Sequence, residues 1–198
     1  MQKPITISLL ITIFVAIVTW MVFFQSKAIA NKSLPSDLYG TLTPFELPNY
    51  PLQTHQDINT DWMHLADKPL FITTGFTSCT HMCPMTMALY QRISKSVGTD
   101  ANLAFLTVDP ITDTPAQLSK YLANYGPEFI GIRIQDQHQL NSTLQALKQS
   151  FTLTKKSEFI EHQGYIYLMH PKVDGLLVYT DNSPDPMKIR EDLLKLER

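Results

Sequence analysis

The chain carries little charge and no concentration of either sign. Of its 198 residues only 17% are charged, and the net charge is −2 at pH 7. Neither a basic patch nor a run of like charges is present, which argues against a protein that binds nucleic acid. Internal repeats and low-complexity tracts are also missing. In contrast, 44% of the residues are hydrophobic, including ten Phe and eight Tyr, so we expect a packed globular core.

Charge is missing altogether from residues 4–24. About twenty helical residues at about 1.5 Å each would span the roughly 30 Å core of a bilayer, more than the apolar part of a cleaved signal peptide. We therefore expect a transmembrane anchor at 1–25, a tether at 26–42 and a domain at 43–198. A single span at the N-terminus predicts that this domain lies on the extracytoplasmic, periplasmic side. Ala28-Ile29-Ala30 resembles a cleavage site, so a signal peptide is the alternative.

The rest of the chain alternates between strand-like and helix-like segments. The predicted order is a strand at 69–76, a helix from Pro84, a strand at 101–109, a helix from Pro115, strands at 164–169 and 176–180, and a helix at 186–196. Asp174-Gly175 predicts a hairpin between the last two strands. A βαβ unit joined to an antiparallel hairpin is the thioredoxin arrangement. We predict a thioredoxin-like α/β sandwich with a central mixed sheet, preceded by one transmembrane helix.

The chain has only two cysteines, Cys79 and Cys83, both within FTSCTHMCPM. They follow the first predicted strand, where the next helix should begin. Their i, i+4 spacing would place both side chains on one face of that helix, and Pro84 suits its first turn. Because a helix N-terminus stabilises a thiolate, we expect the pKa of both thiols to be low.

Three kinds of site begin from this spacing. A structural disulfide is one, although closing so short a loop removes little entropy from the unfolded chain. A dithiol redox pair is the second, although most such pairs are one residue closer. A metal site is the third. Two thiolates suit Cu(I) or Zn(II), but either ion needs at least one more ligand from elsewhere in the chain.

A histidine is the natural third ligand. The six candidates are His55, His64, His81, His138, His162 and His170. His55, His64 and His138 lie in polar stretches, and we expect them at the surface. His81 lies two residues after Cys79 and should point away from the face that the cysteines share.

His162 and His170 flank the strand predicted at 164–169. An extended chain separates them by about 26 Å at about 3.3 Å per residue, so only one can reach the cysteines. In the predicted topology this strand runs antiparallel to the strand before Cys79. Its N-terminal end, with His162, then lies at the cysteine edge, and His170 lies at the far edge.

A second group of polar residues follows the strand predicted at 101–109. Asp109-Pro110 ends this strand, and we expect Asp113-Thr114-Pro115 to cap the next helix. Thr114 is a typical N-cap and Pro115 suits the first helical position. Asp109 should lie at the cysteine edge of the sheet, where we expect it to support the turn rather than the metal.

From Phe45 onwards the sequence resembles the Sco/SenC family of copper proteins. The resemblance rests on Thr77-Ser78-Cys79-x-x-x-Cys83-Pro84, on Val108-Asp109-Pro110-x-x-Asp113-Thr114-Pro115, and on His162 five residues before Tyr167-Leu168. The family is membrane-anchored and thioredoxin-like, and two cysteines and a histidine bind its copper. The resemblance implies that Cys79, Cys83 and His162 bind a copper ion, as Cu(I) or Cu(II).

Two departures from the family pattern stand near the implied ligands. Thr80-His81-Met82 replaces the usual Pro-Asp between the cysteines, so His81 or the Met82 sulfur could tune the metal or compete for it. Glu161 stands before His162 where the family usually has Asp. We expect ligation to survive both changes.

The resemblance implies a metallochaperone rather than an enzyme. Such a protein would take copper from a donor protein and deliver it to a respiratory oxidase subunit, at the binuclear copper site of cytochrome c oxidase, or to another copper protein. The alternative is a thiol–disulfide oxidoreductase that keeps the cysteines of a partner reduced. That role needs Cys79 and Cys83 as a redox pair but does not need His162.

Overall fold

The computed structural model divides the chain into two units, Met1–Pro35 and Ser36–Arg198. The described residues are 13–21, 34–46, 50–80, 82–149, 164–180 and 183–197. In the first unit, residues 13–21 are helical. Within the described residues no helix has both the length and the apolar character that a membrane span requires. The other residues of the anchor predicted at 1–25 lie outside the described ones.

The described part of the second unit contains one eight-stranded mixed sheet. Its strands are β1 (Thr41–Thr43), β2 (Leu52–Thr54), β3 (Asn59–Thr60), β4 (Leu70–Gly75), β5 (Asn102–Thr107), β6 (Phe129–Arg133), β7 (Ile166–Met169) and β8 (Leu176–Tyr179). The spatial order is β1-β8-β7-β4-β5-β6-β2-β3. β4, β5 and β6 run parallel, whereas β7 pairs antiparallel with both β4 and β8. The predicted mixed sheet and C-terminal hairpin are therefore confirmed.

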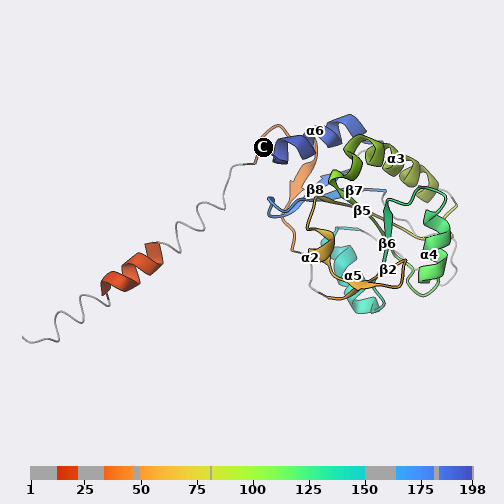
Figure 1. Ribbon diagram of the computed structural model, residues 1–198, viewed down its shortest axis with the longest axis horizontal. Helices are drawn as coiled ribbons and strands as arrows, with labels where there is room; N and C mark the ends of the chain where they lie inside the picture. Colours follow the sequence, from red (N-terminus) through yellow and green to blue (C-terminus); the bar gives the residue numbers. More distant parts are fainter. Residues whose placement is uncertain are drawn as a thin grey trace, which may run out of the picture. The chain divides into compact units, whose positions relative to one another are not determined.

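Helices cover both faces of this sheet. They are α2 (Trp62–Leu65), α3 (Met82–Val97), α4 (Pro115–Leu122), α5 (Gln137–Ala146) and α6 (Pro186–Glu197), and a short 3-10 helix, η1, spans Gly98–Asp100. Figure 1 shows α3 and α6 side by side above the sheet, with α2 and α5 below it. The ring of Phe105 on β5 packs against Tyr121 of α4. α4 therefore covers the same face as α3.

The central strands are apolar because both of their faces are covered. All six residues of β4 are buried. Ile72 and Leu106 join Trp62 and Leu140 in the apolar core on the α2 and α5 face. Full burial of one leucine-sized side chain contributes about 1.5–3 kcal/mol. This continuous apolar character allowed β4 and β5 to be predicted.

The sequence did not lead us to predict β6 and α5. Gly131 and Arg133 interrupt the apolar run of β6, so its own sequence gives only a weak indication of a strand. A side chain at position 131 would collide with Leu122 of α4 and with His55, so the glycine reflects close packing. In α5 the buried residues are few among polar ones, and Asp136 caps the helix by accepting a hydrogen bond from the Gln139 N–H.

Candidate metal centre

Cys79 lies in the turn between β4 and α3. Its backbone N–H donates to the carbonyl of Phe76 at 3.2 Å, and α3 begins only at Met82. The prediction that both cysteines lie on one helical face is therefore wrong for Cys79. The two residues still meet, because the backbone N–H of Cys83 donates to Sγ of Cys79 at 3.3 Å. The two cysteines are not joined by a disulfide.

Cys83 lies beneath the turn, in the first turn of α3, and is only 1% exposed. A Cβ built on Gly75 would approach Cys83 Sγ to 3.0 Å and the ring of Phe105 to 2.8 Å. The missing side chain at the end of β4 therefore makes the space that Cys83 occupies. Cys79 is half-buried, so the two sulfurs differ in their access to solvent.

This burial reverses the effect that we expected for Cys83. Burial raises the pKa of the Cys83 thiol, a hydrogen bond with the Cys79 side chain raises it further, and the backbone N–H of Phe76 opposes the shift. The predicted low pKa is wrong for Cys83, because desolvation of a thiolate here outweighs the field of the helix N-terminus.

The carboxylate of Asp113 joins the cysteine turn to the end of β5. Asp113 is 0% exposed. It accepts hydrogen bonds from the backbone N–H of Thr77 at 3.0 Å, from the Thr77 hydroxyl and from the Thr107 hydroxyl. We expected Asp113 to belong to the cap of the next helix. Instead Thr114 alone caps α4, accepting from the Gln117 N–H at 3.3 Å.

Sequence reasoning missed this role of Asp113, although a signal was available. Thr77 and Thr107 stand at or just after the ends of two strands that we predicted to be parallel, so their hydroxyls were candidates to meet a carboxylate at that edge. Asp109, in contrast, has the expected turn role. Its carboxylate accepts from the backbone N–H of Thr112 at 3.3 Å.

The pairing of β7 shows which of its ends lies at the cysteine edge. Ile166 pairs with Thr73 near the end of β4, and Met169 pairs with Leu70 at its start. His170 follows Met169, so it lies at the opposite edge, as predicted. It is buried there, 4% exposed.

Gly164, two positions after His162, lies close to the cysteine helix. A Cβ built on Gly164 would approach Oγ1 of Thr86 to 2.7 Å. Thr86 is in α3, one turn or less from Cys83. The backbone two positions after His162 therefore touches the part of α3 that holds Cys83. His162 itself lies outside the described residues, as does His81.

The remaining histidines differ in their surroundings. His64 and His138 are exposed, as predicted. The surface prediction is wrong for His55, which is half-buried and accepts the Gly131 N–H on Nδ1 at 3.0 Å. Among the described residues, no three His, Cys, Asp or Glu side chains are grouped closely enough to hold a metal ion.

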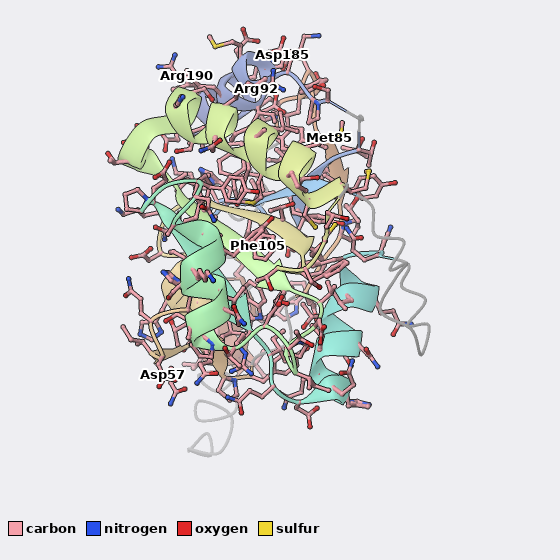
Figure 2. All side chains as sticks on the ribbon, turned by 90° about the vertical axis from the view of Figure 1, so that its right-hand side faces the viewer. Asp57, Met85, Arg92, Phe105, Asp185 and Arg190 are labelled. Atoms are coloured by element: carbon pink, nitrogen blue, oxygen red, sulfur yellow. The ribbon has the colours of Figure 1, made fainter. Side chains whose placement is uncertain are left out.

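Figure 2 shows the cysteine end of α3 above β5, with Phe105 beneath the helix and Met85 at its first turns.

The sequence pattern of the family described as SCO1/SenC matches residues 42–197. The chain belongs to the SCO1/SenC family. This match confirms the resemblance that the cysteine and Asp-Pro motifs indicated.

Individual SCO1/SenC proteins align over most of the folded unit. A SCO2-like protein of Rickettsia prowazekii is 29% identical over 136 residues, which are 64% of this chain and 62% of the relative. The chain thus spans less than two thirds of the length of this relative and of other curated relatives that it matches.

Two solved structures show the fold. Copper-bound ScoI of Bradyrhizobium japonicum has a TM-score of 0.63 and 24% identity, over 75% of this chain and 98% of that one. BsSco, described as a Sco-family cytochrome c oxidase assembly protein with a disulfide switch, has a TM-score of 0.66 and 24% identity, over 79% and 96%. The fold is therefore thioredoxin-like, with a mixed sheet.

The paired sulfurs give this edge of the sheet a defined chemistry. Thiolates are soft ligands that select Cu(I) and Zn(II), whereas a carboxylate such as Asp113 suits harder ions. Asp113 already accepts three hydrogen bonds, so it holds the turn instead of offering a free ligand. Cys79 and Cys83 fit a soft metal ion, and they also fit a dithiol redox pair.

Proposed function

We propose that this SCO1/SenC protein binds copper through Cys79, Cys83 and His162 and delivers it to the binuclear copper site of cytochrome c oxidase. The observation that carries the proposal is the close approach of Gly164 to Thr86, which leaves no room for a Cβ at position 164. It brings the chain two residues after His162 against the first turns of α3, where Cys83 lies. The pairing of β7 with β4 supports the same placement.

The donor set suits an ion that must be passed on. Two thiolates favour Cu(I), and an added imidazole makes Cu(II) tolerable. Three protein ligands leave room for an incoming ligand, so the ion can be exchanged without first dissociating into water. Binding releases the thiol protons to solvent. Copper binding by ScoI and the oxidase-assembly role of BsSco support this reading for the family relatives.

The proposal is tested by the copper content and electronic spectrum of the full-length chain. We expect one copper ion per chain and sulfur-to-copper charge-transfer bands, both lost in His162→Ala. His138→Ala is the matched control, because His138 is an exposed histidine on α5. If His162→Ala keeps its copper and its spectrum, His162 is not a ligand and the three-ligand site is wrong.

We also propose that residues 1–25 anchor the protein in a membrane and hold the domain on the extracytoplasmic side. The support is the charge-free run at 4–24. A reporter fused to the C-terminus should be active only outside the cytoplasm, and the protein should resist extraction by alkaline carbonate. Activity of the reporter in the cytoplasm would contradict this orientation.

A thiol–disulfide oxidoreductase is the second candidate. It is favoured by the contact between Cys79 Sγ and the Cys83 backbone, which keeps two cysteines that share no disulfide next to each other. Such an enzyme would reduce a partner disulfide through a mixed disulfide on the more accessible Cys79, with Cys83 resolving it. Turnover of a disulfide substrate that survives His162→Ala and is lost in Cys79→Ser would favour this activity over copper delivery.

A further inference from the structure

Two exposed methionines flank the buried cysteine. Met82 is 48% exposed and Met85 is 70% exposed, whereas Cys83 between them is 1% exposed. Figure 2 places Met85 at the end of α3 that follows the cysteine turn. Burying a methionine side chain is favourable, and packing gives no reason for two of them to face water here. Met87, the third methionine of this segment, is fully buried.

The helix brings the two thioethers together. Residues three apart on a helix are surface neighbours, with about 5–6 Å between their Cβ atoms. Methionine has three rotatable side-chain bonds, so both sulfur atoms can turn toward one ion. From Met82 to Gln91 the sequence has no charged residue. Neither a salt bridge nor a competing hard ligand on this part of α3 therefore occupies the surface beside them.

We propose that Met82 and Met85 form a thioether subsite that takes up Cu(I) before it reaches the cysteines. This inference rests on the proposed function, because it concerns the route by which the same ion reaches the cysteines. Thioethers are soft and select Cu(I). They are also neutral, and the positive end of the α3 dipole disfavours a cation. The subsite is therefore weak, and the cysteine sulfurs, which bind Cu(I) as thiolates once their protons leave, hold the ion more tightly.

Copper remains Cu(I) throughout this transfer, and no electron is exchanged. The two thioethers displace ligands of an incoming Cu(I) complex, which leave with their donor. The half-buried Cys79 then forms its bond to copper as its thiol proton passes to water, and a thioether departs. Cys83 is too buried to meet a donor directly, so an outer soft site beside it shortens the route.

The chain offers its own control for sulfur exposure. Met63 on α2 and Met187 on α6 are 75% and 55% exposed, but neither has a neighbouring exposed methionine three or four residues away. If the site needs two neighbouring thioethers, silver or copper should bind at Met82 and Met85 but not at Met63 or Met187. If exposed thioethers bind these ions in general, all four residues should respond alike.

The first experiment uses the full chain with Cys79→Ser and Cys83→Ser and with ¹³C-labelled methionine methyl groups. Ag(I), a redox-inert substitute for Cu(I), is titrated in chloride-free buffer. We expect the methyl signals of Met82 and Met85 to shift together, and we expect the Met82 shift to be lost in Met85→Leu. Equal shifts at Met63 and Met187, or no shift at Met82 and Met85, would overturn the subsite.

The second experiment keeps the cysteines and measures how fast they are loaded from a Cu(I)–chelator complex. Leucine preserves the apolar surface and removes only the sulfur, so Met82→Leu with Met85→Leu should slow loading. Met63→Leu with Met187→Leu should load at the wild-type rate. Equal rates for both double variants would overturn the role in uptake. The final copper content tests the cysteine site separately, so failure of the proposed function is distinguishable from failure of the subsite.

Discussion

Asp113 holds the cysteine turn through Thr77, accepting both its backbone N–H at 3.0 Å and its hydroxyl. Replacing Asp113 by alanine would remove the acceptor of these part-buried donors and of the buried Thr107 hydroxyl. We expect the free energy of unfolding to fall by about 2–4 kcal/mol. We also expect weaker copper binding, because Cys79 lies two residues after Thr77. Urea unfolding and a competitive copper titration measure the two effects.

Asp113→Asn is the control for charge. Its side-chain oxygen, in the place of Oδ2, can still accept from the Thr77 N–H and the Thr107 hydroxyl, and the Thr77 hydroxyl can rotate to accept from its amide. The loss of stability should therefore be smaller than for alanine. Equal losses for the two variants would show that the hydrogen bonds to Thr77 are not what Asp113 contributes.

The two cysteines should differ in reactivity. Cys79 is half-buried, Cys83 is 1% exposed, and burial raises the pKa of the Cys83 thiol. Since the thiolate is the reactive form, iodoacetamide at pH 8 should modify Cys79 well before Cys83. Peptide mass spectrometry at a series of times measures both rates. In urea the rates should converge, and equal rates in the folded protein would contradict the burial of Cys83.

Gly75→Ala should disturb the site without changing any ligand. The new methyl group would come within 3.0 Å of Cys83 Sγ and 2.8 Å of the Phe105 ring. Overpacking of this kind costs about 1–3 kcal/mol, and Cys83 must shift to relieve it. We expect a lower melting temperature and weaker copper binding in a competition titration.

Gly98→Asn is the matched substitution. A Cβ at Gly98 meets no atom within 4 Å, and its φ of +65° is one that asparagine tolerates. This variant should keep its copper affinity. If Gly75→Ala bound copper as tightly as Gly98→Asn, the space beneath Gly75 would not matter to the metal site.

Much of the fold could be predicted because its central elements are locally distinct. β4 is an unbroken buried run, and Thr114 with Pro115 marks the start of α4. β6 lacks such a run, since Gly131 and Arg133 interrupt it. β6 is stabilised by contacts with segments that lie beside it only in the folded protein, and its own sequence does not indicate them.

The site could be predicted as a set of residue types but not as an environment. The spacing of Cys79 and Cys83 indicated a soft ligand pair. The raised pKa of Cys83 arises from burial beneath Gly75 and Phe105, which only the folded sheet brings together. The role of Asp113 likewise depends on Thr77, 36 residues away. Long-range contacts of this kind leave little trace in one sequence.

Acid should destabilise the protein through two histidines, the half-buried His55 and the buried His170. Nδ1 of His55 accepts the Gly131 N–H at 3.0 Å, and Nδ1 of His170 accepts the Lys172 N–H at 3.2 Å. Burial lowers the pKa of both rings below the ordinary 6.5, and nearby Lys172 lowers that of His170 further. The folded protein therefore keeps these rings neutral at a pH where the unfolded chain already binds protons.

Because the unfolded state binds more protons in this range, the free energy of unfolding falls as pH falls. The contribution is complete above about pH 6.5 and is lost progressively as pH falls toward the lowered pKa values of the folded state. Urea unfolding between pH 8 and pH 5 measures it. In His55→Asn the amide oxygen can still accept the Gly131 N–H but cannot titrate, so the slope below pH 6.5 should be shallower. His138→Asn, at an exposed position, should keep the wild-type slope. Identical slopes for both variants would show that protonation of His55 does not drive the acid sensitivity.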